Sequence, residues 1–183
     1  MKTNKNLLMM AVLTAFLFVT SFSFAQEKME AKPKEDKSKR PSPPAKVTEK
    51  VGAATVTIDY SRPSVKGRKI FGGLEPYGKV WRAGANEATT FEVDKDVKIN
   101  GQPLPKGKYA LFAIPTETEW TLIFDKKSEQ WGAYDYKEGN DALRIKVKPV
   151  KSPKLTELLT YTIDKKGDVK LWWENVEVPF KVQ

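Results

Sequence analysis

Residues 91–114, FEVDKDVKINGQPLPKGKYALFAI, decide the fold because they contain short strands separated by turn sequences. Phe91 and Val93 alternate with acidic residues, which is the period of two typical of a half-buried strand. Asn100-Gly101 follows the next apolar run, and this dipeptide suits the positive φ values of a tight hairpin turn. A Pro-Lys-Gly turn comes soon after it. The stretch therefore predicts an antiparallel meander.

The same pattern of short alternating runs continues on both sides of this meander, and no long amphipathic helix interrupts it. We therefore predict an all-β fold, a single antiparallel β-sandwich or jelly-roll-like domain over residues 47–183. Residues 155–163 are ambiguous between helix and strand, and we favour strand for the second half. Further strands are predicted at 55–60, 120–124, 143–147, 169–174 and 176–182.

The first residues resemble a leader rather than part of the fold. Lys2 and Lys5 precede an apolar run at 7–19, and small residues end it around Ala25. We predict a signal peptide over 1–25 and an exported protein, periplasmic or secreted. A run of about 13 apolar residues is shorter than the roughly 20 that span a bilayer, so no transmembrane segment is expected after cleavage.

Residues 26–46 are charged or proline in most positions and have little to bury, which predicts a disordered tether. The formal charge of +9 includes Lys2 and Lys5, so removal of the leader leaves +7. This excess predicts weak attraction to anionic envelope surfaces. Basic and acidic residues are interspersed and no recognition-helix pattern is present, so nucleic-acid binding is not expected.

The chain has no histidine and no cysteine. This excludes Ser-His-Asp and Cys-His catalysis, histidine-based zinc sites, thiol redox chemistry and disulfides. Acidic residues are frequent, but neither residues 94–96 nor the group Glu117, Glu119 and Asp125 has the spacing of a calcium loop. We therefore assign no metal, no cofactor and no catalytic residue, and we favour a role other than that of an enzyme.

The connection Ser61–Thr90 is too long and too rich in functional groups for an ordinary link between strands. We expect it to form the functional surface, with seven candidate ligand-binding residues. Six of them also have a structural interpretation: Trp81 as a core anchor, Arg82 paired with Glu87, Asn86 capping a turn, and the basic residues Arg62 and Arg68 on a solvated face. The candidates are Arg62, Arg68, Tyr77, Trp81, Arg82, Asn86 and Glu87.

This loop, read with residues 106–109 and the sequence Trp131-Gly132-Ala133-Tyr134, resembles the domain of unknown function 2911 family, small exported proteins of Bacteroidetes-type bacteria. The resemblance covers nearly all of residues 47–182. It implies export and a single β-rich domain, and it supplies no catalytic residues.

Three hypotheses follow for function. The leading one is a binding module that holds a small polar molecule or glycan through the Ser61–Thr90 loop. The second is a structural or interaction protein of the cell envelope, in which the loop is a rigid plug. The third is a carboxylate-dependent hydrolase using Glu87 with Asp59 or Asp135.

Overall fold

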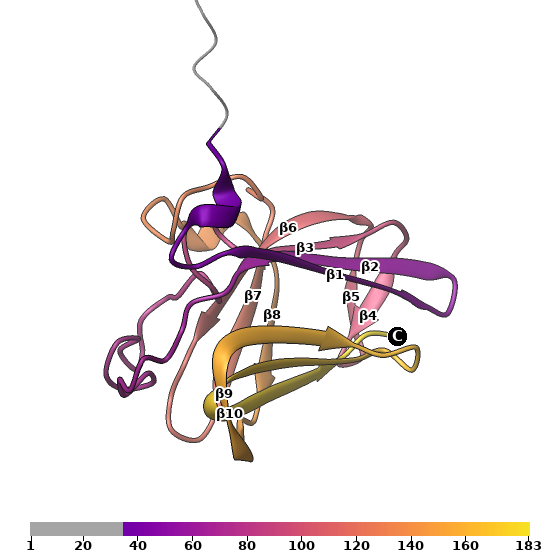
Figure 1. The fold of residues 1–183 in the computed structure, drawn as a ribbon. Helices are drawn as coiled ribbons and strands as arrows, with labels where there is room; N and C mark the ends of the chain where they lie inside the picture. The colour runs from indigo at the N-terminus through magenta and orange to yellow at the C-terminus, as the bar shows by residue number, and fades with distance from the viewer. Residues whose placement is uncertain (1–34) are drawn as a thin grey trace, which may run out of the picture. The chain divides into compact units, whose positions relative to one another are not determined.

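The computed structural model describes residues 35–183, and their strands form antiparallel sheets (Figure 1). The largest sheet has six strands in the order β1-β2-β3-β6-β7-β8. Two hairpins, β4-β5 and β9-β10, complete the strands of this part. The bounds are β1 Pro44–Val51, β2 Ala54–Ser61, β3 Thr90–Val93, β4 Val97–Ile99, β5 Gln102–Leu104, β6 Gly107–Ile114, β7 Trp120–Asp125, β8 Asp141–Val147, β9 Val150–Ile163 and β10 Asp168–Lys181.

The all-β class is confirmed for the described residues, whose helical segments are two short 3-10 turns, Lys37–Lys39 and Glu138–Asn140. The predicted signal peptide at 1–25 lies outside these residues. Within residues 35–183 no helix has the length and apolar character needed to cross a membrane. The predicted hairpin turn at Asn100-Gly101 is confirmed, with φ of +49° and +82° at the two positions.

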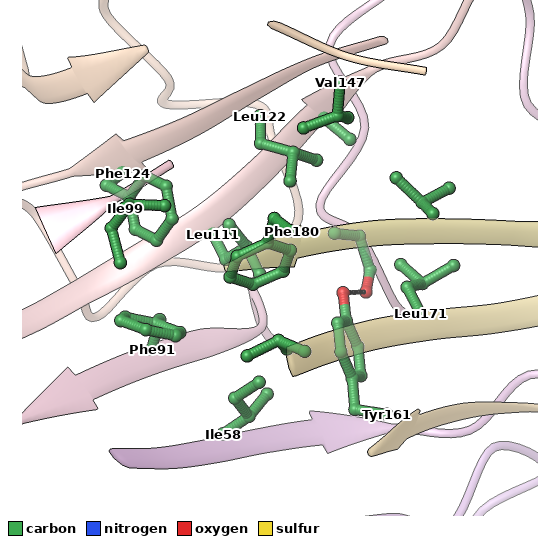
Figure 2. Packing of buried hydrophobic residues seen from close by; sticks show 14 of the residues in the cluster. Ile58, Phe91, Ile99, Leu111, Leu122, Phe124, Val147, Tyr161, Leu171 and Phe180 are labelled. Atoms are coloured by element: carbon green, nitrogen blue, oxygen red, sulfur yellow. Dashed lines mark hydrogen bonds between the residues drawn. The ribbon is translucent and has the colours of Figure 1, made fainter. Parts of the chain in front are cut away.

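The main core lies between one face of the six-stranded sheet and the β9-β10 hairpin. Figure 2 shows Ile58, Phe91 and Phe124 from the sheet close to Tyr161 and Phe180 from the hairpin. The rings of Phe91 and Phe124 are 5.1 Å apart and nearly perpendicular, a geometry favoured by aromatic quadrupoles. This burial is what stabilises a chain that has no disulfide.

A second, smaller cluster lies on the opposite face of the sheet. It consists of Ala88, Ala110, Phe112 and Ile123, with half-buried side chains packed around it. One of these, Tyr136, meets the ring of Phe112 at 5.2 Å and belongs to the segment between β7 and β8. Residues from two long loops therefore cover this face.

The prediction of a disordered tether over 26–46 is wrong from about residue 36 onward, while residues 26–34 lie outside the described part. Asp36 caps the first 3-10 turn by accepting from the Ser38 amide at 3.1 Å. β1 begins at Pro44, and its Ala45 and Val47 pack against the main core. The segment has few apolar side chains to bury, but backbone hydrogen bonds to β2 along the whole of β1 stabilise it instead.

The C-terminal hairpin is also more continuous than predicted. Residues 155–163 are all strand, and β10 runs through Asn175 without a break. The pairing register with β9 shifts on either side of Glu174, which has φ of +56°, so the strand contains a β-bulge there. The predicted strands at 169–174 and 176–182 are therefore one bulged strand.

Gly167 closes the β9-β10 turn in a conformation that suits only glycine. Its φ is +84°, and a Cβ atom there would lie 2.0 Å from the Val182 carbonyl oxygen. We expect Gly167→Ala to lower the free energy of unfolding by about 2–4 kcal/mol, measured by urea denaturation. Gly139→Ala is the control, because no atom lies within 4 Å of its added Cβ. Equal losses in the two variants would contradict this account.

Candidate functional site

The long loop between β2 and β3 is anchored by aromatic packing. Trp81 is 4% exposed and stacks on Trp173 of β10, with ring centroids 5.7 Å apart and an interplanar angle of 18°. Phe71 and Trp120 meet the Trp81 ring edge-on at 5.8 and 6.2 Å. The indole Nε1 donates to the Gly84 carbonyl at 3.1 Å. These contacts agree with the structural interpretation of Trp81, a core anchor for the loop.

The turn that follows Trp81 is fixed by buried hydrogen bonds. The Ala83 carbonyl accepts from the Thr89 hydroxyl and from the Tyr161 hydroxyl, each at 2.9 Å. Ala83 itself has φ of +49°. Gly84 is needed because an added Cβ would lie 2.6 Å from Thr89 Oγ1. The loop is therefore tied to β9 as well as to β10.

Asn86 connects three segments of the chain. Its Nδ2 donates to the Ser42 carbonyl at 3.0 Å and to Ser61 Oγ at 3.2 Å. The backbone carbonyl oxygen of Asn86 accepts from Arg82 Nη1 at 2.7 Å. Its φ of +59° is a value that asparagine tolerates better than most residues. Asn86 therefore holds two other parts of the chain onto the loop. They are the end of β2 and the segment before β1, residues 36–43, which we call the N-terminal segment.

Glu87 does not pair with Arg82. Its two carboxylate oxygens accept from Lys37 at 2.9 Å and from Arg40 at 2.7 Å. Arg40 also lies over the ring of Trp131, 5.8 Å from its centroid. Partial burial raises the pKa of Glu87, but the hydrogen bonds from Lys37, its backbone and Arg40 outweigh this and lower the pKa to about 2. A carboxylate held this way is a poor proton donor near neutral pH.

The carboxylates proposed for hydrolysis are each held in an ion pair. Asp59 lines the same hollow as Glu87, about 290 Å³ in volume, but pairs with Lys46 at 3.2 Å. Asp135 pairs with Lys127 at 3.4 Å. Asp135 does not line this hollow, so the structure brings Asp59 but not Asp135 together with Glu87.

The remaining candidates differ in their surroundings. Arg62 donates to the Leu159 carbonyl at 3.0 Å and to the Thr160 hydroxyl at 2.8 Å, so it ties the loop to β9. Arg68 is exposed and donates to carbonyl groups within its own loop. Tyr77 is 38% exposed. Of these three, Arg62 is partly buried, whereas Arg68 and Tyr77 are exposed.

Glu75 was not predicted, and it has the most unusual environment in the loop. It is half-buried, and the described residues give its carboxyl group neither a hydrogen bond nor an ion pair. Burial raises its pKa to about 7, against an opposing effect of the nearby Arg82 and Arg68 charges. The sequence offered no signal for it, because a single Glu between a Gly-Gly pair and a proline resembles an ordinary turn residue.

Glu75 and Arg82 lie between two hollows and contribute to the wall of both. The first, about 250 Å³, is also lined by residues of the N-terminal segment and by Trp173. The second, about 230 Å³, is bordered by Val80, Ala133 and Tyr134. We call the two hollows together the Glu75–Arg82 cleft. Tyr134 is 81% exposed at its border, and Trp131 of the same segment is 52% exposed.

Comparison with known proteins gives one match. The model of DUF2911, a protein family of unknown function, matches residues 42–182, and the chain belongs to this family. The match begins at Ser42, so it includes β1 and part of the segment that the sequence had assigned to the tether. Neither the curated proteins nor the solved structures contain a match.

We expect Asn86→Ala to destabilise the protein by about 2–3 kcal/mol, because it removes two hydrogen bonds and places a less tolerant residue at positive φ. Asn86→Gly keeps the backbone conformation accessible and should lose less. Urea denaturation of both variants measures the difference. An Asn86→Ala variant as stable as the wild type would show that the turn does not depend on this side chain.

The lowered pKa of Glu87 predicts that the folded protein loses stability as the pH becomes acidic. Its pKa falls from an ordinary 4.5 to about 2 on folding, so its stabilising contribution is complete above pH 4.5 and is lost as the pH decreases toward 2. The melting temperature of Glu87→Gln should therefore change less than that of the wild type between pH 6 and pH 3. Glu92→Gln, at an exposed position on β3, is the matched control and should follow the wild type. Identical profiles for Glu87→Gln and the wild type would refute the pairing.

Proposed function

We propose that this protein is an exported β-sandwich module that binds a small polar molecule, a glycan in particular, in the Glu75–Arg82 cleft. The proposal of export is supported by the leader-like sequence at 1–25 and places the protein in the periplasm or outside the cell. The observation that carries the proposal of binding is that polar groups with unused hydrogen-bonding capacity lie beside an exposed aromatic border.

The polar groups of the cleft have bonding capacity to spare. Arg82 uses Nη1 for the Asn86 carbonyl, and its guanidinium has further N–H donors. The Glu75 carboxyl offers two oxygens that no described residue bonds. Sugar hydroxyls both donate and accept, so a donor and an acceptor on adjacent walls suit them.

The aromatic border supplies the apolar part of such a site. Tyr134 lines the second hollow together with Arg82 and Glu75, and its ring is exposed over most of its surface. An exposed ring beside directed hydrogen-bonding groups is the usual composition of a ligand site, because it buries area while the polar groups orient the ligand. The rigid anchoring of the loop through Trp81 reduces the ordering cost of binding.

Acid–base chemistry is a second candidate function because Glu75 has a pKa of about 7. That value is suited to proton transfer at neutral pH, and it shifts the hydrolase hypothesis from Glu87 to Glu75. The structural role in the envelope, with weak attraction to anionic surfaces through the basic N-terminal segment, is the remaining alternative.

A glycan array followed by calorimetry tests the proposal. We expect Tyr134→Ala to weaken the binding of any glycan hit about tenfold, with an unchanged melting temperature because the side chain is exposed. Glu75→Gln should weaken it as well, whereas Leu155→Ala, which removes an exposed apolar side chain from β9, should not. Absence of any hit, or equal affinity in all three variants, would refute the proposal.

A further inference from the structure

We propose that a calcium ion binds between Asp125, at the end of β7, and Asp141, at the start of β8. This site is separate from the Glu75–Arg82 cleft and does not depend on the proposed function. It would replace the sequence-based expectation of no metal. That expectation grouped Asp125 with Glu117 and Glu119, whereas the structure pairs Glu119 with Lys146 at 2.9 Å.

The two carboxylates belong to residues that are paired across neighbouring strands. Asp125 and Asp141 are partners in the β7-β8 register, immediately after a shift between Phe124 and Asp125, and alternation places Asp125 on the same face as Ile123. That face carries the smaller apolar cluster, which includes Ile123 and Tyr136. Asp125 is wholly buried, and the side chain of Asp141 is 10% exposed.

In each carboxylate one oxygen accepts hydrogen bonds and the other accepts none from the described residues. Asp125 Oδ1 accepts from the Lys127 amide at 2.7 Å. Asp141 Oδ2 accepts from the Tyr136 hydroxyl at 3.0 Å and from Arg144 Nε at 2.5 Å. Asp125 Oδ2 and Asp141 Oδ1 are buried and accept no hydrogen bond from the described residues. Buried acceptors of this kind are rare because the lost hydration costs free energy.

A third oxygen without a donor belongs to the irregular segment that follows β7. Gln130 Oε1 is buried without a donor, while its Nε2 donates to the Lys127 carbonyl at 2.6 Å. Lys127 in turn bonds Asp125 through its amide. Three unsatisfied oxygens therefore lie within one short section of the chain and its strand partner. Oxygens without donors are the groups that a cation can satisfy.

The local charges also favour a cation. Two buried carboxylates are opposed by one partly buried cation, Arg144, which also contacts Glu138 at 3.3 Å. Lys127 directs its ammonium group to Asp135 instead, and Lys126 is exposed. The charges of Lys126 and Lys127 also act on Asp125 from these exposed positions, but burial, helped by the Asp141 charge, still raises the pKa of Asp125. The two buried carboxylate charges are therefore incompletely compensated, which is costly.

The donor set selects the kind of ion. The chain has no histidine or cysteine, so the ligands are oxygens, and carboxylate and amide oxygens suit hard cations such as calcium. Within residues 35–183 no three acidic, histidine or cysteine residues are grouped so that they could hold a metal ion together, so the site has only two charged ligands. This predicts a dissociation constant on the order of 10⁻⁴–10⁻³ M, the range of extracellular calcium modules.

Thermal unfolding with and without calcium tests the proposal. Protein stripped with a chelator is melted at pH 7.5 in buffer alone and with 5 mM CaCl₂, at matched ionic strength. We expect calcium to raise the melting temperature by about 2–4 °C, because a ligand that binds the folded state stabilises it by mass action. No calcium-specific rise would overturn the proposal and would leave a proton shared by the two carboxylates as the explanation.

Variants locate the site. Asp125→Asn should abolish the calcium response while retaining the fold, since its amide oxygen can still accept from the Lys127 backbone amide. Asp135→Asn removes an exposed carboxylate from the same segment and should respond like the wild type. A calcium response retained by Asp125→Asn would overturn the proposal. Equilibrium dialysis of the wild type with radioactive calcium is independent of variant folding: about one ion per chain is expected, and none would overturn it.

Discussion

The stacking of Trp81 on Trp173 is the contact on which the rest of the structure depends. It joins the middle of a long loop to the C-terminal hairpin, and Phe71 and Trp120 complete an aromatic layer around it. The chain has no disulfide, so burial of these rings and hydrogen bonds such as those at Ala83 have to hold the loop. Ring pairs of this kind contribute about 0.5–1.5 kcal/mol each beyond their buried area.

Buried side chains hold the loop in place, so the side chains on its outer surface are not needed for anchoring and can bind a ligand. Ala83 and Thr89 are completely buried, whereas Glu75 and Arg82 border the cleft. The structural and binding interpretations of the loop are therefore compatible, since they concern different residues of the same segment. The N-terminal segment adds to the frame through its contacts with Asn86 and Glu87.

The sequence predicted the strands better than the site, for a physical reason. Alternation and turn residues are local, so the meander and the turn at Asn100-Gly101 could be read directly. The partners of Glu87 lie 50 and 47 residues away, on a segment whose composition resembles a disordered tether. The environment of Glu75 likewise depends on burial and on neighbouring charges that only the folded chain brings together.

Hydrogen exchange of the loop amides, followed by NMR, tests most directly whether the aromatic layer holds the loop rigid. The Trp81 amide bonds the Ala113 carbonyl at 2.8 Å, and Ala113 returns the bond at the same distance. We predict that the Trp81 amide exchanges as slowly as amides of the interior strands β6 and β7, which open only with global unfolding. Exchange at the rate of an exposed peptide would contradict the account, because the loop would then open independently of the core.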